Sequence, residues 1–227
     1  MLERFKDFST ANVADACQRL GVPVRAVPLK AAIGERVAGR VLPVQHSGSL
    51  DVVFEAIGLA GPGDVLVIDN AGRRDEGCFG DLLAIEAEYA QLSGAVIWGV
   101  HRDTAGLRKV GLPVFSLGEV PTYPWRLGPA PADPFSTATV GDCQVTREDV
   151  VLGDEDGVLF IPGDRLDELF DLAEAIKKNE DRQIAAVRAG HPLREQMKFD
   201  EYLKLRATDP SLTFPGYLHT LSTTAKK

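Results

Sequence analysis

An alternation of apolar runs and helical segments in the middle of the chain constrains its fold more than any other feature. Three runs rich in Val, Ile and Phe have the length and composition of buried strands: DVLVIDN (64–70), AVIWGV (95–100) and PVFSLG (113–118). Helical segments over 81–93 and 104–110 separate them. Strands that alternate with helices pair in parallel through right-handed crossovers, so the pattern predicts an α/β fold.

Capping and turn residues predict further elements on both sides of this region. Ser9 and Thr10 can cap a first helix over 10–20, and short β-branched runs after it predict strands before the turn GLAGPGD (58–64). The tight turn DEDG (154–157) lies between two apolar runs and predicts a pair of strands.

Loops and a long helix complete the prediction. Segments 71–80 and 119–137 are expected to be loops, the second because it is rich in Pro and aromatic residues. A helix over 164–189, with Asp164 as its N-cap, has an apolar face made of Leu166, Leu169, Phe170, Ala173 and Ile176. We expect residues 1–189 to form one domain, and 190–227 to be an extension that packs on a neighbouring subunit.

Charge and hydropathy exclude two classes of partner. The net charge is −8 and no basic stripe is present, so we expect no binding to nucleic acid. No segment has the apolar length of a signal peptide or membrane span. Cys17, Cys78 and Cys143 are scattered, as expected of small buried side chains in the reducing cytoplasm.

Two corners at the carboxyl ends of neighbouring predicted strands hold the candidate functional residues. Ligands commonly bind at this edge of a parallel sheet. The first corner, Gly80 to Leu83, opens a helix whose free N–H groups suit a carboxylate. At the second corner, the Arg102 guanidinium suits a carboxylate or an enolate, and Asp103 is a hard ligand for Mg²⁺ or Mn²⁺.

Each of these residues also has an ordinary structural explanation. Asp81 alone is more often a helix cap, and Arg102 with Asp103 is more often a surface ion pair followed by a cap. His101-Arg102-Asp103 matches the kinase catalytic loop, but the other kinase motifs are absent from the sequence. We expect His101 to be a loop residue with no dedicated role.

The spacing of the two corners favours function. Asp81, twenty intervening residues and Arg102-Asp103 reproduce D-x20-R-D, the signature of the class II 4-hydroxy-4-methyl-2-oxoglutarate aldolases. From about residue 9 to residue 182 the chain resembles this family, which also includes the regulators of ribonuclease activity A and is called RraA-like. The resemblance implies a β/β/α swivelling-domain fold, in which helices flank a mixed central sheet, and a homotrimer or a dimer of trimers.

The resemblance also implies a role for each residue of the corners. Asp103 would be the protein ligand of a divalent metal, Mg²⁺ or Mn²⁺, and Arg102 would bind the pyruvyl group and stabilise its enolate. Asp81 would assist proton transfer. The pyruvyl carboxylate would bind the backbone N–H groups of Gly80, Asp81, Leu82 and Leu83.

The implied activity is that of a metal-dependent lyase. It would cleave 4-hydroxy-2-oxo acids to pyruvate and a second oxo compound. It would also decarboxylate oxaloacetate, because both reactions leave a pyruvate enolate. The alternative is a non-catalytic protein that binds and regulates a ribonuclease, which needs no catalytic residues. The complete set of Asp81, Arg102 and Asp103 favours the enzyme.

Three further residues bear on the substrate. Trp98 stands where the family commonly has Asp, and we expect it to pack in the core and reshape the wall of the site. Arg73 and Arg74 precede the first corner, and we expect one of them to pair with the distal carboxylate of a dicarboxylic substrate. The alternative is that both are solvated cations that balance Asp75 and Glu76.

Overall fold

The computed structural model describes residues 1–126, 128–129 and 131–224. The chain forms two compact units, Met1–Glu174 and Ala175–Lys227. The first unit contains every strand of the described residues and both predicted corners, so it carries the candidate site.

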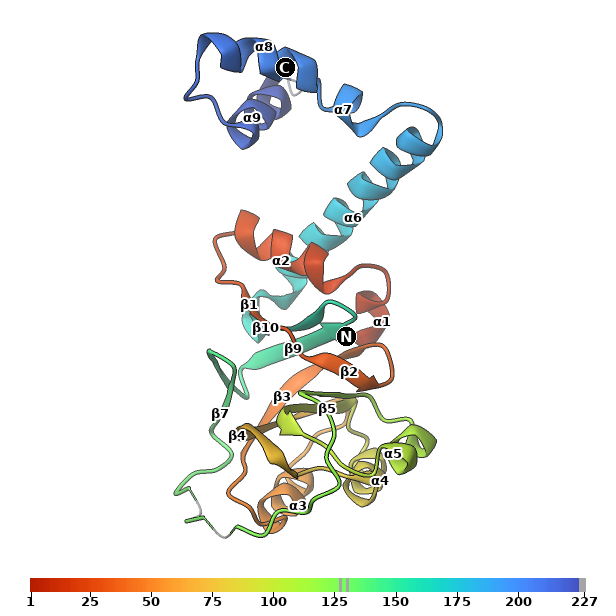
Figure 1. Cartoon of the computed structure of the whole chain (residues 1–227), viewed down its shortest axis with the longest axis vertical. Helices are drawn as coiled ribbons and strands as arrows, with labels where there is room; N and C mark the ends of the chain where they lie inside the picture. The colour runs from red at the N-terminus through yellow and green to blue at the C-terminus, as the bar shows by residue number, and fades with distance from the viewer. Residues whose placement is uncertain (127, 130, 225–227) are drawn as a thin grey trace. The chain divides into compact units, whose positions relative to one another are not determined.

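The described residues of the first unit form an eight-stranded mixed sheet with the order β1-β10-β9-β3-β4-β5-β6-β2 (Figure 1). The pairs β4–β5 and β5–β6 are parallel, as predicted, the pair β3–β4 is parallel as well, and the others are antiparallel. The strands are β1 (Arg25–Val27), β2 (Lys30–Ile33), β3 (Val37–Gln45), β4 (Val65–Gly77), β5 (Gly94–Val100), β6 (Val114–Ser116), β9 (Asp149–Asp154) and β10 (Gly157–Pro162). Two more strands, β7 (Thr137–Val140) and β8 (Cys143–Thr146), form a separate hairpin.

Strand β4 is longer than predicted, because it continues through most of the segment expected to be a loop. Its register against β5 shifts twice, between Asp69 and Arg73 and between Arg73 and Gly77. Ala71 and Gly72 have left-handed backbone, with φ of 53° and 68°. Such bulges break the alternation of apolar and polar residues, so the sequence pattern does not reveal the end of this strand.

The helices of the first unit include all those predicted, several with different ends, and two short helices that were not predicted. They are α1 (Leu2–Phe5), α2 (Thr10–Arg19), α3 (Asp51–Gly58), α4 (Asp81–Tyr89), α5 (Thr104–Val110) and the start of α6 (Leu166–Arg188). Helix α3 was not predicted, and α4 ends four residues before its predicted end at Ser93. The prediction of Asp164 as an N-cap is wrong, since Asp164 lies within a 3₁₀ turn (Gly163–Arg165) that precedes α6.

The two faces of the sheet bury separate cores, because successive residues of a strand point to opposite sides. Leu42 and Leu66 pack with apolar residues of α3, α4 and α5, which Figure 1 shows together beside β4 and β5. Val41 and Val65, their neighbours in sequence, pack on the other face with residues of the β7–β8 hairpin. Each such buried side chain contributes roughly 1.5–3 kcal/mol, so the central strands are held from both sides.

The N-terminal helix is tied to the last hairpin of the sheet. Ser9 caps α2 through a reciprocal capping box with Asn12, as predicted for this helix start. The Asp154 carboxylate accepts hydrogen bonds from the backbone N–H and the hydroxyl of Thr10, both at 2.7 Å. On α6 the predicted apolar face is buried from Leu169 to Ile176, whereas Leu166 is partly exposed.

The second unit is helical, with the end of α6 followed by α7 (Leu193–Gln196), α8 (Phe199–Thr208) and α9 (Phe214–Thr224). Four aromatic rings from α8 and α9 pack together, with centroids 5.0–6.4 Å apart: Phe199, Tyr202, Phe214 and Tyr217. Throughout the part of the chain that the structure describes, no helix is long and apolar enough to cross a membrane.

Candidate functional site

The two predicted corners lie side by side at the ends of β4 and β5. The Arg102 N–H donates to the Phe79 carbonyl at 2.9 Å, and the Cys78 N–H donates to the Val100 carbonyl at 3.2 Å. These bonds continue the β4–β5 pairing beyond the last ladder pair, Gly77 with Val100. Parallel pairing therefore places the start of α4 against the start of α5, although twenty residues separate the two corners in sequence.

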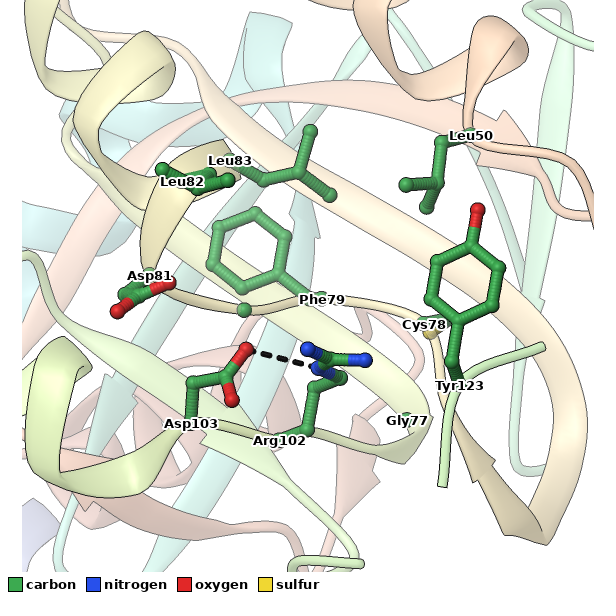
Figure 2. Close-up of a pocket in the computed structure, with 11 residues that line it drawn as sticks. Leu50, Gly77, Cys78, Phe79, Asp81, Leu82, Leu83, Arg102, Asp103 and Tyr123 are labelled. Carbon is green, nitrogen blue, oxygen red and sulfur yellow. Dashed lines mark hydrogen bonds and ion pairs between the residues drawn. The ribbon is translucent and has the colours of Figure 1, made fainter. Parts of the chain in front are cut away.

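A small cavity opens between the corners (Figure 2). Its volume is about 140 Å³. A cavity of about 150 Å³ is large enough for benzene, so this one suits a molecule of the size of pyruvate. The cavity is lined by all six residues of the two predicted corners and by five others. Its lining consists of Leu50, Gly77, Cys78, Phe79, Gly80, Asp81, Leu82, Leu83, Arg102, Asp103 and Tyr123.

Asp103 does not act as an ordinary helix cap, which was one alternative. It precedes α5, but its side chain makes no capping hydrogen bond, and its backbone is left-handed with φ of 55°. The carboxylate oxygen Oδ2 instead accepts from Arg102 Nε at 2.7 Å, so the ion-pair part of that alternative is present. Asp tolerates the left-handed region better than most residues, and such conformations are concentrated at functional sites.

The Arg102 guanidinium is half turned to solvent, with the side chain 32% exposed. Figure 2 shows it between Asp103 and Tyr123, whose ring centroid lies 5.6 Å from Arg102 Cζ. Only Nε has a hydrogen-bond partner among the described residues, so both terminal nitrogens remain available within the cavity. A pair of parallel N–H groups matches a carboxylate or an enolate with two oxygens.

Asp81 is the first residue of α4 and not its cap, because Gly80 is the N-cap and provides no side-chain bond. The first N–H groups of this helix therefore lack a capping side chain, and the residues that carry them line the cavity. Two glycines make room for the carboxylates. A Cβ at Gly80 would lie 2.6 Å from Asp103 Oδ2, and a Cβ at Gly106 would lie 2.1 Å from Asp81 Oδ2.

Tyr123 is a cavity residue that sequence reasoning missed. It belongs to the Pro-rich segment after β6, which shows no periodicity that could indicate its position. Backbone contacts of its neighbour Thr122 hold it in place. Gly77 N–H donates to the Thr122 carbonyl at 2.9 Å, and the Thr122 hydroxyl donates to the Asp75 carbonyl at 2.6 Å.

Two further groups near the corners were not predicted to matter. Cys78 lines the cavity, but burial raises the pKa of its thiol to about 12, so it stays protonated and is a poor nucleophile. His101 is buried, contrary to the expectation of a loop residue without a role. Its ring nitrogens bond the hydroxyls of Ser116 at 2.9 Å and Thr104 at 3.0 Å, and burial lowers its pKa. It thereby anchors the second corner to β6 and α5.

Three residues expected to shape the site lie outside the cavity. Trp98 packs with the core on the hairpin side of the sheet, so the core-packing part of its prediction holds but it forms no part of the cavity wall. Arg73 pairs with Asp75 and Glu76, and Arg74 donates to the Leu117 carbonyl. The expectation that either arginine reaches the distal end of a substrate in this cavity is therefore wrong.

The cavity suits a hard divalent cation. Across the described residues no three His, Cys, Asp or Glu side chains converge as a closed metal cage. However, Mg²⁺ keeps several waters and is commonly bound by only one or two carboxylates. Asp103 and Asp81 provide such donors, and the space beside Asp103 exists only because Gly80 has no Cβ.

Fold and cavity together define an α/β protein with a small cavity, lined by one arginine and two aspartates, at the carboxyl ends of parallel strands. Residues 10–160 match the sequence profile described as RraA-like, Aldolase/RraA. The chain belongs to this family, and its mixed sheet flanked by helices is the fold that the resemblance implied.

Individual relatives carry both kinds of function. A protein of Aromatoleum aromaticum named "Putative 4-hydroxy-4-methyl-2-oxoglutarate aldolase" is 30% identical over 67% of this chain and 95% of its own. The RNA-processing inhibitor RraA from Thermus thermophilis is 27% identical, with a TM-score of 0.58 over 66% of this chain and 92% of that chain. Protein DlpA of Legionella pneumophila is 27% identical over 88% of this chain, which spans only 33% of DlpA.

Proposed function

We propose that this protein is a divalent-metal-dependent lyase that cleaves 4-hydroxy-2-oxo acids to pyruvate and a second oxo compound. We also propose that it decarboxylates oxaloacetate. The observation that carries the proposal is the convergence of Asp81, Arg102 and Asp103 on one cavity of pyruvate size. The aldolase name of a relative at 30% identity supports it.

In the proposed reaction the bond between C3 and C4 of the substrate breaks. The proton of the 4-hydroxyl group leaves, C4 becomes the carbonyl carbon of the second product, and the bonding electron pair moves to C3. This gives pyruvate as its enolate, which takes a proton at C3 to complete the cycle. In oxaloacetate the same electron pair is left when carbon dioxide departs from C3.

The residues of the cavity bind and stabilise the charges of this reaction. The N–H groups at the start of α4 hold the pyruvyl carboxylate, aided by the positive end of the helix dipole. Arg102 donates its free terminal N–H groups to the enolate oxygen, where negative charge develops. Asp81 is the remaining carboxylate of the cavity and transfers the proton.

Asp103, with Asp81 beside it, is the residue that would hold the metal. A bound Mg²⁺ or Mn²⁺ supplies Lewis-acid stabilisation of the developing enolate. Arg102 Nε donates to Asp103 Oδ2 at 2.7 Å, which fixes the orientation of the carboxylate. Oδ1 is the carboxylate oxygen that is left for the metal. By resemblance, we further propose that the chain works in the cytoplasm as a homotrimer or a dimer of trimers.

The test is pyruvate formation from a panel of 4-hydroxy-2-oxo acids and oxaloacetate, after chelation and again with Mg²⁺ or Mn²⁺ restored. We expect turnover that depends on the metal and that is lost when Arg102 is replaced by Ala. The metal-free protein and the protein-free reaction with metal are the controls, since metal ions alone decarboxylate oxaloacetate slowly. Absence of pyruvate from every substrate would overturn the lyase.

The second candidate is a protein-binding regulator of a ribonuclease, which the RNA-processing inhibitor among the solved relatives favours. A variant of the cavity residue Arg102 distinguishes this regulator from the lyase. A regulator should inhibit a purified ribonuclease equally well with Arg102→Ala, because binding between proteins does not need the cavity. A lyase loses its activity with this change.

A further inference from the structure

We propose that Arg126 is a positioning residue of the candidate site, because it holds Tyr123 beside the Arg102 guanidinium. Arg126 itself is not part of the cavity lining. Since this role concerns the group that would bind the pyruvyl end, it rests on the proposed lyase function. The contacts that carry it lie within one chain, and a bound metal or a neighbouring subunit would add to the cavity without replacing them.

Tyr123 belongs to a segment, residues 119–126, that we call the strap. The strap contains neither helix nor strand, so its backbone is held by contacts with other segments. Its start is bound to the second corner, where the Val120 N–H donates to the His101 carbonyl at 2.9 Å. Its middle is bound to β4 through the carbonyl and the hydroxyl of Thr122. The anchor at its end is a side chain, that of Arg126.

The Arg126 side chain binds two buried acceptors of β4 at once. Its Nε donates to Glu76 Oε1 and its Nη2 donates to Asn70 Oδ1, both at 2.7 Å. Glu76 is 5% exposed and Asn70 is fully buried. The same Nη2 also donates to the His46 carbonyl at 3.4 Å. Such contacts use the rigid fork of donors that Arg has and Lys lacks.

His46 orients the amide that receives this fork. Its Nδ1 lies 2.9 Å from Asn70 Oδ1. Because a guanidinium only donates, Asn70 must present its oxygen to Arg126, and His46 Nδ1 is then a second donor to that oxygen. Two polar atoms of the cluster, His46 Nε2 and Asn70 Nδ2, are buried without a partner among the described residues. Unpaired buried groups cost free energy, so stability alone does not explain why the fold keeps this cluster.

The anchor joins three segments that line the cavity, namely those that carry Leu50, Gly77 to Phe79, and Tyr123. Arg126 follows Tyr123 by three residues and bonds the residue directly before Gly77. Gly48 lets the strap approach the segment of Leu50, because a Cβ there would lie 1.9 Å from the Arg126 carbonyl oxygen. Loss of the Arg126 side chain therefore loosens one wall of the cavity against the other two.

The functional consequence is transmitted by the Tyr123 ring. Figure 2 shows this ring beside the Arg102 guanidinium, and its centroid lies 5.6 Å from Arg102 Cζ. A ring face at this distance attracts the cation and limits its movement. Asp103 holds Nε from the other side at 2.7 Å, so the two contacts together direct the terminal N–H groups. Arg126 thus acts on Arg102 through Tyr123.

A pair of variants separates this role from a general effect on stability. Arg126→Gln removes the fork without leaving Glu76 alone, because Arg73 Nε lies 3.4 Å from the same carboxylate oxygen. Arg25→Gln is the matched control. Arg25 lies in β1, at one end of the sheet, and pairs with Asp149 at 2.6 Å. Its side chain is 24% exposed, against 30% for Arg126.

The first test measures hydrogen exchange, resolved to single amides, at the Gly77 N–H. This group donates to the Thr122 carbonyl of the strap at 2.9 Å, so its exchange reports how firmly the strap is held. We expect exchange to be at least about tenfold faster in Arg126→Gln and unchanged in Arg25→Gln. The measurement requires no substrate and no turnover.

The second test is a double-mutant cycle in kcat/KM for pyruvate formation, assayed well below the unfolding midpoint of each variant. Arg126→Gln and Tyr123→Ala should each lower kcat/KM about tenfold. If Arg126 acts through Tyr123, the double variant should also lose about tenfold, whereas independent effects would multiply to about 100-fold. Arg126→Lys should fall between Gln and the wild type, because one ammonium cannot reach both acceptors as the fork does.

The outcomes separate this role from the proposed function. If the wild type forms no pyruvate, the lyase is wrong, and exchange at Gly77 alone tests the anchor. Exchange that is the same in Arg126→Gln and the wild type, or equally fast in Arg25→Gln, would overturn the positioning role. A loss near 100-fold in the double variant would overturn it as well, since Arg126 would then act on the site without Tyr123.

Discussion

At the scale of single residues, the backbone of Asp103 argues against ordinary helix capping, and its side chain makes the ion pair with Arg102 that the structural alternative predicted. A residue that only capped α5 would have extended backbone and a side chain bonded to the helix N–H groups. Asp103 has neither, since it is left-handed and directs its carboxylate to Arg102. The left-handed backbone of Asp103 thus places its carboxylate in the lining of the cavity.

Replacing Asp103 by Asn tests this role with little change in shape. Asn also tolerates left-handed backbone, so we expect the free energy of unfolding to change by less than about 1 kcal/mol. Metal-dependent pyruvate formation should fall by at least about 100-fold, because an amide is a weak ligand for a hard cation. Steady-state kinetics over a range of Mg²⁺ concentrations, beside thermal unfolding, measures both. Activity near that of the wild type at limiting Mg²⁺ would remove Asp103 from the metal site.

Arg102→Lys keeps the charge but loses the fork of parallel donors. We expect a loss of about 2–4 kcal/mol in transition-state stabilisation, the range found for a donor to a developing anion. It should appear mainly in kcat, because the interaction strengthens as the enolate forms. Steady-state kcat and KM, measured for the Arg102→Lys variant and for the wild type, test whether the loss is mainly in kcat. Full activity with Lys would mean that Arg102 does not contact the pyruvyl group.

At the scale of elements, the site depends on how closely α4 and α5 approach. The Asp81 carboxylate of α4 lies where a side chain at Gly106 of α5 would begin. The position of the carboxylate is thus set by a residue of the neighbouring helix, and the contact between the two helices is part of the site.

Gly106→Ala should displace the Asp81 carboxylate, because the new methyl carbon would lie 2.1 Å from Oδ2. Turnover should fall at least about tenfold. The free energy of unfolding should fall as well, because the new methyl carbon would also lie 2.7 Å from Asp81 Cβ and the two helices must move apart, which outweighs the helix preference of Ala over Gly of up to ~1 kcal/mol. Gly58→Ala in α3 is the matched control, because no atom lies within 4 Å of its Cβ position. We expect it to leave turnover unchanged. Equal turnover in both variants would show that the position of Asp81 is unimportant.

The elements that the sequence predicted well are those with local signals. Ser9 and Gly111 mark the ends of helices through capping and a left-handed C-terminal glycine, and both positions agree with the structure. Helix α3 was missed because it is short and lies between turn residues. The end of β4 was missed because its bulges hide the alternation.

In the candidate site, too, residues with a recognisable sequence signal were predicted and residues without one were missed. The six residues of the two corners were predicted from the ends of the parallel strands together with the resemblance to the D-x20-R-D signature, and they do line one cavity. Tyr123 reaches the cavity through hydrogen bonds between distant segments, which leave no periodic signal in sequence. The direction of Arg73 and Arg74 depends on the bulges of β4, so their charge alone predicted the wrong contact.

At the scale of the whole molecule, buried histidines make stability depend on pH. His46 is 7% exposed, and burial lowers its pKa below the usual 6.5, an effect that its bond to Asn70 reduces. Because the folded state binds this proton less readily than the unfolded state, the stabilisation is complete above pH 6.5. It is lost as the pH falls through the lowered pKa of the folded protein.

The free energy of unfolding should therefore fall between pH 7 and pH 5, and less steeply in His46→Gln. One proton accounts for a slope of at most about 1.4 kcal/mol per pH unit. Urea unfolding at a series of pH values measures the slope, and the exposed His191→Gln serves as control. A slope that stays the same in His46→Gln but changes in His191→Gln would contradict the assignment.

The C-terminal unit makes a separate prediction about the domain boundary. The first compact unit ends at Glu174, within α6, and no residue of α6 beyond Ile176 is buried. A chain that ends at Ala189 should therefore keep its unfolding midpoint within a few degrees, followed by circular dichroism. The mass of the assembly, by light scattering, should fall if the extension joins subunits as predicted. An insoluble or unfolded product would show that the first unit needs residues 190–227.

The hydrogen bonds between Thr10 and Asp154 can form only after most of the first unit has been synthesised. They span 144 residues, and β1 and β3 likewise pair with β10 and β9 near the end of the first unit. At about 5–20 residues per second, a ribosome needs roughly 7–30 s to make the partner of the first helix. During that interval α2 and β1 lack β9 and β10, the strands against which they pack and pair. The nascent protein is therefore a natural client for chaperones until its last hairpin emerges.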